Sequence, residues 1–182
     1  MLKLNKNNGW IDGTRHCPSP NYDDRPEGSK IDLLVIHNIS LPPGQYGGEY
    51  IEQLFTNNLD PKEDPYFQEI YEMEVSSHLL INRLGEIIQF VPLTKRAWHA
   101  GISEFQGCEC CNDFSIGIEL EGCDDEAYED AQYASLVELT RLIQQQWPEI
   151  EMDRIVGHCD IAPDRKTDPG ESFDWIKYKK LV

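Results

Sequence analysis

The sequence has no apolar run approaching the roughly 18 residues of a membrane span, and no apolar segment near its N-terminus of the kind found in signal peptides. Internal repeats and Ser/Gly-rich linkers are also missing, and 182 residues are a usual length for one domain. We therefore expect a single domain over residues 1–182, located in the cytoplasm.

Basic residues are scarce. Lys and Arg number 16 against 33 Asp and Glu, which gives a formal net charge of −17. Such a chain repels phosphate backbones and anionic lipid headgroups. We therefore expect neither nucleic acid nor a membrane among its partners.

Cysteine is present at six positions, which in a reducing cytosol predicts free thiols rather than disulfides. An alternative for three of them, Cys108, Cys110 and Cys111, is a zinc site. Their spacing lacks the two-residue gap typical of structural zinc sites, which favours free thiols. The other cysteines are Cys17, Cys123 and Cys159.

The hydrophobic pattern predicts an α/β fold, with a mixed central β-sheet flanked by helices. Residues 31–36 form an apolar, β-branched run typical of a buried strand, and residues 130–147 carry an apolar stripe at helical spacing. Residues 82–85 predict a hairpin turn between two strands. Strands are predicted at 31–36, 76–81, 86–91, 115–121 and 154–157, and helices at 49–57, 130–147 and 172–181.

No His-Glu-x-x-His helix, phosphate loop or Gly-x-Ser-x-Gly elbow is present, so no local motif identifies a function. Two histidines, His37 and His158, each follow a short apolar strand, and Asp168 lies ten residues after His158, before a Pro-Gly turn. Two His and one carboxylate form a three-ligand zinc set with an open fourth position. The alternative is a pair of ordinary hydrogen-bonded histidines.

The strand at 115–121 alternates strictly, with Glu119 and Glu121 on the same side. Either carboxylate could act as a general base, or both could be solvated side chains on an outer face. The pattern alone leaves this choice open, and it equally leaves Lys166 as an ordinary surface lysine.

Four sequence words carry a resemblance to a known family. They are LVIHNISLPPG at 34–44, AWHAG at 97–101, NDFSIGIELEG at 112–122 and GHCDIAPDRKTDPG at 157–170. In this order they resemble the AmpD group of zinc amidases, cytosolic anhydromuramyl-peptide amidases that share a fold with peptidoglycan recognition proteins. The resemblance runs from about residue 9 to the C-terminal helix.

The resemblance implies Zn²⁺ as cofactor, with His37, His158 and Asp168 as ligands and Glu119 and Lys166 as catalytic residues. It implies hydrolysis of the amide bond between (1,6-anhydro-)N-acetylmuramic acid and L-alanine in peptidoglycan recycling. The partner would be a small soluble anhydromuramyl peptide, with no obligate protein partner. A non-catalytic peptidoglycan-fragment-binding protein of this fold is the alternative, and an exported amidase acting on polymeric wall is a second.

The resemblance also predicts substrate contacts for Asn38, and an aromatic face suits a sugar ring, so Trp98 and His99 are further candidates. Core packing is the alternative for Trp98 and His99, and His16 and His78 are interpreted as structural.

The chain departs from its relatives where arginines are common. Cys108, Cys110 and Glu74 stand in such places, which puts contacts to the carboxylates of the stem peptide in doubt. Cys159 is a rival to Asp168 as ligand, but we expect it to face away from His158 because neighbours on extended chain point to opposite sides. Residues 41–74, rich in Gly and Pro, could form a movable cover over the cleft.

Overall fold

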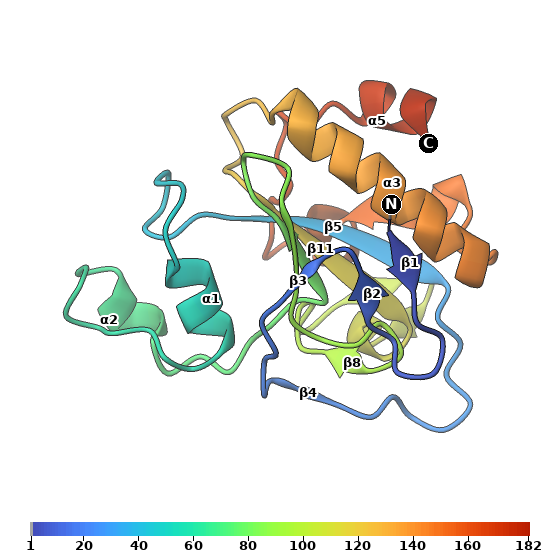
Figure 1. The fold of residues 1–182 in the computed structure, drawn as a ribbon, viewed down its shortest axis with the longest axis horizontal. Helices are drawn as coiled ribbons and strands as arrows, with labels where there is room; N and C mark the ends of the chain where they lie inside the picture. The colour runs from blue at the N-terminus through green and yellow to red at the C-terminus, as the bar shows by residue number, and fades with distance from the viewer. Residues whose placement is uncertain (1) are drawn as a thin grey trace.

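A computed structural model describes residues 2–182 and contains one mixed six-stranded sheet (Figure 1). Its strands, in spatial order, are β12 (Ile155–Gly157), β5 (Leu33–Ile39), β11 (Ser115–Glu121), β6 (Leu79–Ile81), β7 (Ile87–Gln89) and β3 (Arg15–His16). The first four run parallel, β7 is antiparallel to β6, and β3 is parallel to β7. The predicted mixed central sheet is confirmed.

Helices cover both faces of this sheet (Figure 1). The long helix α3 (Asp130–Gln146) and the C-terminal α5 (Trp175–Leu181) lie on one face. On the other side lie α1 (Tyr50–Phe55), α2 (Phe67–Ile70) and the short α4 (His158–Ile161). None of the helices within residues 2–182 combines the length and apolar character needed to cross a membrane.

Short elements complete the described chain. Three two-stranded sheets pair β1 (Lys3–Leu4) with β2 (Ile11–Asp12), β4 (Tyr22–Asp23) with β8 (Arg96–Ala97), and β9 (Glu104–Phe105) with β10 (Cys108–Glu109). Two 3₁₀ turns lie at Cys111–Asp113 and Met152–Arg154.

Side-chain alternation in the two central strands separates the core from the site. The side chains of Ile116, Ile118 and Leu120 in β11 pack in the cluster beneath α3. Because successive side chains point to opposite faces, Glu119 must lie on the other face. The same holds in β5, where Leu34 and Ile36 join the α3 cluster and the intervening residues face away. His37 of β5 and Glu119 and Glu121 of β11 therefore emerge on one face, opposite the helix that covers the apolar side chains.

Several boundaries differ from the prediction. The strand predicted at 31–36 begins at Leu33 and continues to Ile39, so His37 lies within β5 instead of after it. The backbone stays extended there because β11 pairs with β5 as far as Glu121, which matches Ile39. The strands β6 and β7 are shorter than predicted, although the hairpin between them is confirmed. Within residues 41–74 the helix predicted at 49–57 is present as α1, and α2 is a further helix that was not predicted.

Candidate active site

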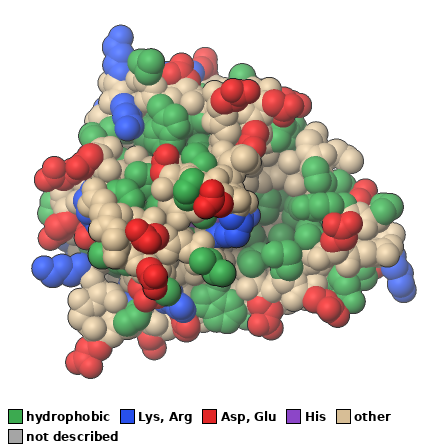
Figure 2. Space-filling view, turned by 180° about the vertical axis from the view of Figure 1, so that it is seen from behind, with side chains coloured by type: hydrophobic (Ala, Val, Ile, Leu, Met, Phe, Trp, Pro, Cys, Tyr) green, Lys and Arg blue, Asp and Glu red, His purple; other side chains and the backbone are tan. Residues whose placement is uncertain are grey.

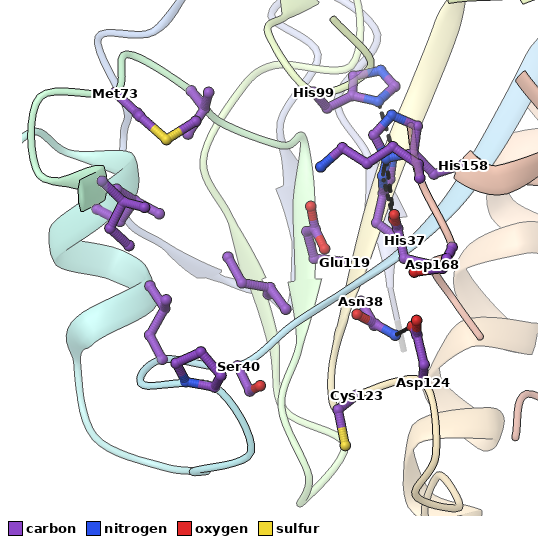
Figure 3. A pocket seen from close by; sticks show the side chains of 18 of the residues that line it. His37, Asn38, Ser40, Met73, His99, Glu119, Cys123, Asp124, His158 and Asp168 are labelled. Carbon is purple, nitrogen blue, oxygen red and sulfur yellow. Dashed lines mark hydrogen bonds and ion pairs between the residues drawn. The ribbon is translucent and has the colours of Figure 1, made fainter. Parts of the chain in front are cut away.

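A cavity of about 890 Å³ opens where β5, β11 and the β12–α4 junction meet. One wall is polar, and Figure 3 shows its residues converging from these elements. The opposite wall is apolar and comes from α1, α2 and the segments beside them. That apolar wall comprises Leu41, Pro43, Leu54, Phe55, Tyr66, Ile70, Met73 and Val75.

Three ligand-type atoms meet at the base of the polar wall. His37 Nδ1 lies 3.0 Å from His158 Nδ1 and 3.1 Å from Asp168 Oδ2. His158 Nδ1 also lies 3.1 Å from Asp168 Oδ2, so the three atoms form a nearly equilateral triangle. This is the only group of potential metal ligands found among the described residues 2–182.

Strand register and one backbone hydrogen bond bring these residues together. Gly157 of β12 is matched with Ile36 of β5, so the residues that follow them in the chain, His158 and His37, become neighbours. The backbone N–H of Cys159 donates to the carbonyl of Asp168 at 3.0 Å, which returns the Asp168 segment to the start of α4. Asp168 is therefore placed by the fold, although it lies outside the sheet.

The donor set fits a divalent cation. The Nε2–H of His158 donates to the carbonyl of Ala100 at 3.1 Å, which leaves Nδ1 of the neutral ring with its lone pair toward the triangle. Burial lowers the pKa of His37 to about 4, so its ring is neutral at pH 7. Although burial opposes it, the adjacent imidazoles of His158 and His37 hold the pKa of the Asp168 carboxyl below its ordinary value. Two imidazole nitrogens and a carboxylate are a zinc ligand set with one position left open.

Glu119 stands beside this triangle. It is matched with His37 across the β5–β11 pair, on the same face, and it lines the cavity. Its Oε2 is buried without a hydrogen-bond partner among residues 2–182. Burial and, next, the negative charge of Asp168 raise the pKa of Glu119 well above 4.5, while the charge of Lys166 opposes the shift. A desolvated carboxylate with a free oxygen is suited to accept a proton.

Glu121 is held by the backbone of two loops. Its Oε1 accepts from the N–H of Gly47, and its Oε2 accepts from the N–H of Arg83 at 2.9 Å. Both oxygens thus tie loops to β11. The structure also shows that neither glutamate lies on a solvated outer face, since Glu119 is 8% and Glu121 is 4% exposed.

The three predicted substrate contacts all line the cavity. Asn38 donates from Nδ2 to Asp124 Oδ1 at 2.8 Å (Figure 3). Trp98, in the segment 97–101, is half-buried. His99 uses Nδ1 to contact His37 Nε2 at 2.8 Å and Nε2 to contact Ser115 Oγ at 3.0 Å.

Sequence reasoning missed several residues that shape the site. Asn112 Oδ1 accepts from the N–H groups of His99 and Ala100, which holds the 97–101 segment in place. Asn112 begins the segment at 112–122 that carries the family resemblance, and this position could have indicated its role. Nothing in the local sequence indicates Asp124 or the contribution of Met73, which lies across the cavity in Figure 3. These residues are brought in by long-range packing.

The remaining histidines and cysteines lie outside the triangle. His78 Nδ1 accepts from the N–H of Gly117, and its Nε2 contacts the carbonyl of Lys95 at 3.0 Å, so both its nitrogens are bound to backbone. His16 contacts the carbonyl of Ile11. All six cysteines have free thiols in the structure, and Cys159 contributes no atom to the triangle.

Comparison with known proteins identifies the family. The family model described as N-acetylmuramoyl-L-alanine amidase matches residues 27–171. The chain is 58% identical over 174 residues to the 1,6-anhydro-N-acetylmuramyl-L-alanine amidase AmpD of Escherichia coli (strain K12), covering 96% of this chain and 94% of that protein. The AmpD of Haemophilus influenzae is 57% identical, with 96% of this chain and 95% of that protein covered.

Solved structures agree with this assignment. A crystal structure of an AmpD derivative superposes with a TM-score of 0.95 at 54% identity, covering 99% of both chains. AmiD from E. coli, in complex with the substrate anhydro-N-acetylmuramic acid-L-Ala-D-γ-Glu-L-Lys, gives a TM-score of 0.63 at 28% identity, covering 99% of this chain and 65% of that one. The predicted fold and family are confirmed, and the chain belongs to the N-acetylmuramoyl-L-alanine amidase family, with AmpD-type enzymes as similar relatives over nearly its whole length.

Proposed function

We propose that this protein uses Zn²⁺ to hydrolyse the amide bond between 1,6-anhydro-N-acetylmuramic acid and the L-alanine of a soluble muropeptide, in peptidoglycan recycling. One observation carries the proposal: the triangle of His37, His158 and Asp168 atoms lies beside the unpartnered carboxylate of Glu119. The names of the AmpD relatives support the bond that is cut.

His37, His158 and Asp168 would hold the metal. A zinc ion there would lower the pKa of bound water to about 7 and polarise the substrate carbonyl. The free Oε2 of Glu119 would take the proton of the attacking water, because its buried carboxylate is a stronger base than an exposed one. Glu119 would then deliver that proton to the nitrogen of the departing L-alanine.

Lys166 would act on the carbonyl oxygen. Its side chain lines the same cavity, and its positive charge lowers the pKa of Glu119 against the effect of burial and contributes to the lowered pKa of His37. An ammonium group in that place would stabilise the negative charge that develops on the oxygen as water attacks. Removal of one such donor typically costs about 10²–10³ in kcat.

The cavity suits a ligand with one polar and one apolar side. Its polar wall carries Asn38 and Asp124, and its apolar wall carries Tyr66 and Met73. Figure 2 shows hydrophobic side chains gathered to one side of a hollow in the surface. We propose a small soluble muropeptide as the substrate, with Asn38 and Trp98 in contact with it, and a cytoplasmic enzyme acting as one domain without an obligate protein partner.

Peptide release from anhydro-N-acetylmuramyl tripeptide tests the proposal, measured before chelation, after chelation and after zinc is restored. We expect release that chelation abolishes and zinc restores. Tight binding of the fragment without release would instead support a non-catalytic binding protein. Release that is insensitive to chelation would contradict the metal role of the His37 triangle, and recovery of the native protein in a periplasmic fraction would contradict the cytoplasmic location.

A further inference from the structure

His99 lines the cavity and also contacts His37, one of the three residues of the metal-ligand triangle. Its Nδ1 is 2.8 Å from Nε2 of His37, the ring nitrogen of His37 that points away from the triangle. The two rings are nearly perpendicular, at 87°, with centroids 4.9 Å apart. His37 is only 1% exposed, and His99 is the hydrogen-bond partner of that nitrogen.

The second nitrogen of His99 has a hydroxyl partner, which can accept a proton carried on that nitrogen. Its Nε2 lies 3.0 Å from Ser115 Oγ. If His99 donates its Nε2–H to Ser115, its Nδ1 is a free acceptor and receives the Nε2–H of His37. The neutral ring of His37 then has its lone pair on Nδ1, within the triangle. The reverse direction would put a proton on His37 Nδ1 and block it as a ligand.

Gly117 provides the space that this arrangement needs. It lies in the middle of β11, on the same face as Glu119, and a Cβ there would come within 2.6 Å of the Cγ and Nδ1 atoms of His99. Real Cβ atoms do not approach so closely, so any side chain at position 117 would displace the imidazole. Asn112 holds the backbone of the same residue by accepting the N–H of His99.

From these contacts we infer that His99 is a positioning residue that holds His37 in the tautomer able to bind the metal, with Ser115 and Gly117 maintaining its orientation. This inference rests on the proposed zinc site. Because both ring nitrogens are already bonded, His99 has no free polar atom for the substrate. It therefore acts on the metal through His37.

Zinc affinity, measured by competition with a fluorescent chelator, tests the inference without using activity. His99→Leu removes the acceptor and should weaken zinc binding about 10- to 100-fold, the usual cost of losing such a partner. His99→Asn keeps an oxygen where Nδ1 stands and should recover most of the affinity. Gly117→Ala should weaken binding although every ligand and His99 itself are retained.

Gly85→Ala is the matched control for general destabilisation. Its Cβ would crowd the Ala131 carbonyl at 2.8 Å, on the hairpin and away from His37, so it should lower stability and leave zinc affinity unchanged. Imidazole ¹⁵N spectra of the zinc-loaded wild type should show His99 neutral and protonated at Nε2. At saturating zinc, His99→Leu should retain the wild-type KM.

Two results would overturn the inference. One is an unchanged zinc affinity in His99→Leu combined with a raised KM, which would make His99 a substrate contact. The other is a His99 protonated at Nδ1 in the zinc-loaded protein. If the wild-type protein binds no zinc, the proposed function is refuted together with the inference. If the wild type binds zinc and either result above is found, only the inference fails.

Discussion

Glu119 and Glu121 are a natural matched pair, because they lie two residues apart on the same face of β11 and are both buried. Replacement of each by glutamine preserves shape and removes charge. For Glu119→Gln we expect kcat to fall by about 10²–10⁴, the usual contribution of a general base. For Glu121→Gln we expect nearly normal kcat and a loss of stability.

The stability difference follows from the hydrogen bonds. Glu121 accepts two backbone N–H bonds, and a glutamine has only one oxygen for them. Loss of one bond to a charged acceptor should cost about 2 kcal/mol, or a fall in Tm of about 4–8 °C for a domain of this size. Glu119 Oε2 has no bond to lose among the described residues, so Glu119→Gln should unfold at the same free energy as the wild type or a higher one.

The pH dependence gives a second check on Glu119 in the metal-free protein. Burial raises the pKa of its carboxyl in the folded state above 4.5, so the group favours the folded state below its unfolded pKa. That contribution is lost as pH rises through the raised pKa. Glu119→Gln lacks the group, so its stability relative to wild type should improve over that rising pH range.

Urea unfolding of the chelated proteins and peptide release by the zinc-loaded ones are the two assays. The reasoning would be refuted if Glu121→Gln lost the rate while Glu119→Gln retained it. A Glu119→Gln variant less stable than wild type by 2 kcal/mol or so would show that its carboxylate makes a structural bond in solution.

Three further changes separate the roles of the other residues. Lys166→Met should lower kcat about 10²-fold with unchanged zinc content by native mass spectrometry, since it removes one stabilising charge and no ligand. Tyr178→Phe should lower unfolding free energy by about 1 kcal/mol in urea and leave kcat unaltered, because its buried hydroxyl bonds to Thr140 at 2.7 Å. Met73→Ser should raise KM about fivefold at constant kcat, because it removes ~1 kcal/mol of apolar contact between the cavity wall and the substrate. A changed zinc content in Lys166→Met would contradict the first expectation, and a changed kcat in Tyr178→Phe the second. An unchanged KM in Met73→Ser would contradict the third.

Local pattern alone predicted the elements that form the core. The apolar stripe of residues 130–147 became α3, and the alternation at 115–121 became β11 with the same boundaries. These predictions succeed because burial on one side of a helix or strand leaves a fixed period in the sequence. The prediction failed at the end of β5, where polar residues continue the strand because a neighbouring strand pairs with them.

The resemblance of four sequence segments predicted the family, and comparison with known proteins confirmed it. The same resemblance predicted His37, His158 and Asp168 as metal ligands and Glu119 and Lys166 as catalytic residues. Sequence alternation could not distinguish Glu119 from Glu121. The structure distinguishes them, because the register of β11 on β5 matches Glu119 with His37 while backbone N–H groups occupy both oxygens of Glu121.

The sequence by itself therefore determined the central strands and the longer helices, and which residue types are available for chemistry. Only the tertiary structure decided that His99 contacts His37, that Gly117 leaves room for it, and that α1 and α2 form the apolar wall. The reason is physical: periodicity records what each segment buries, whereas strand register and contacts between distant segments depend on the packing of the whole chain.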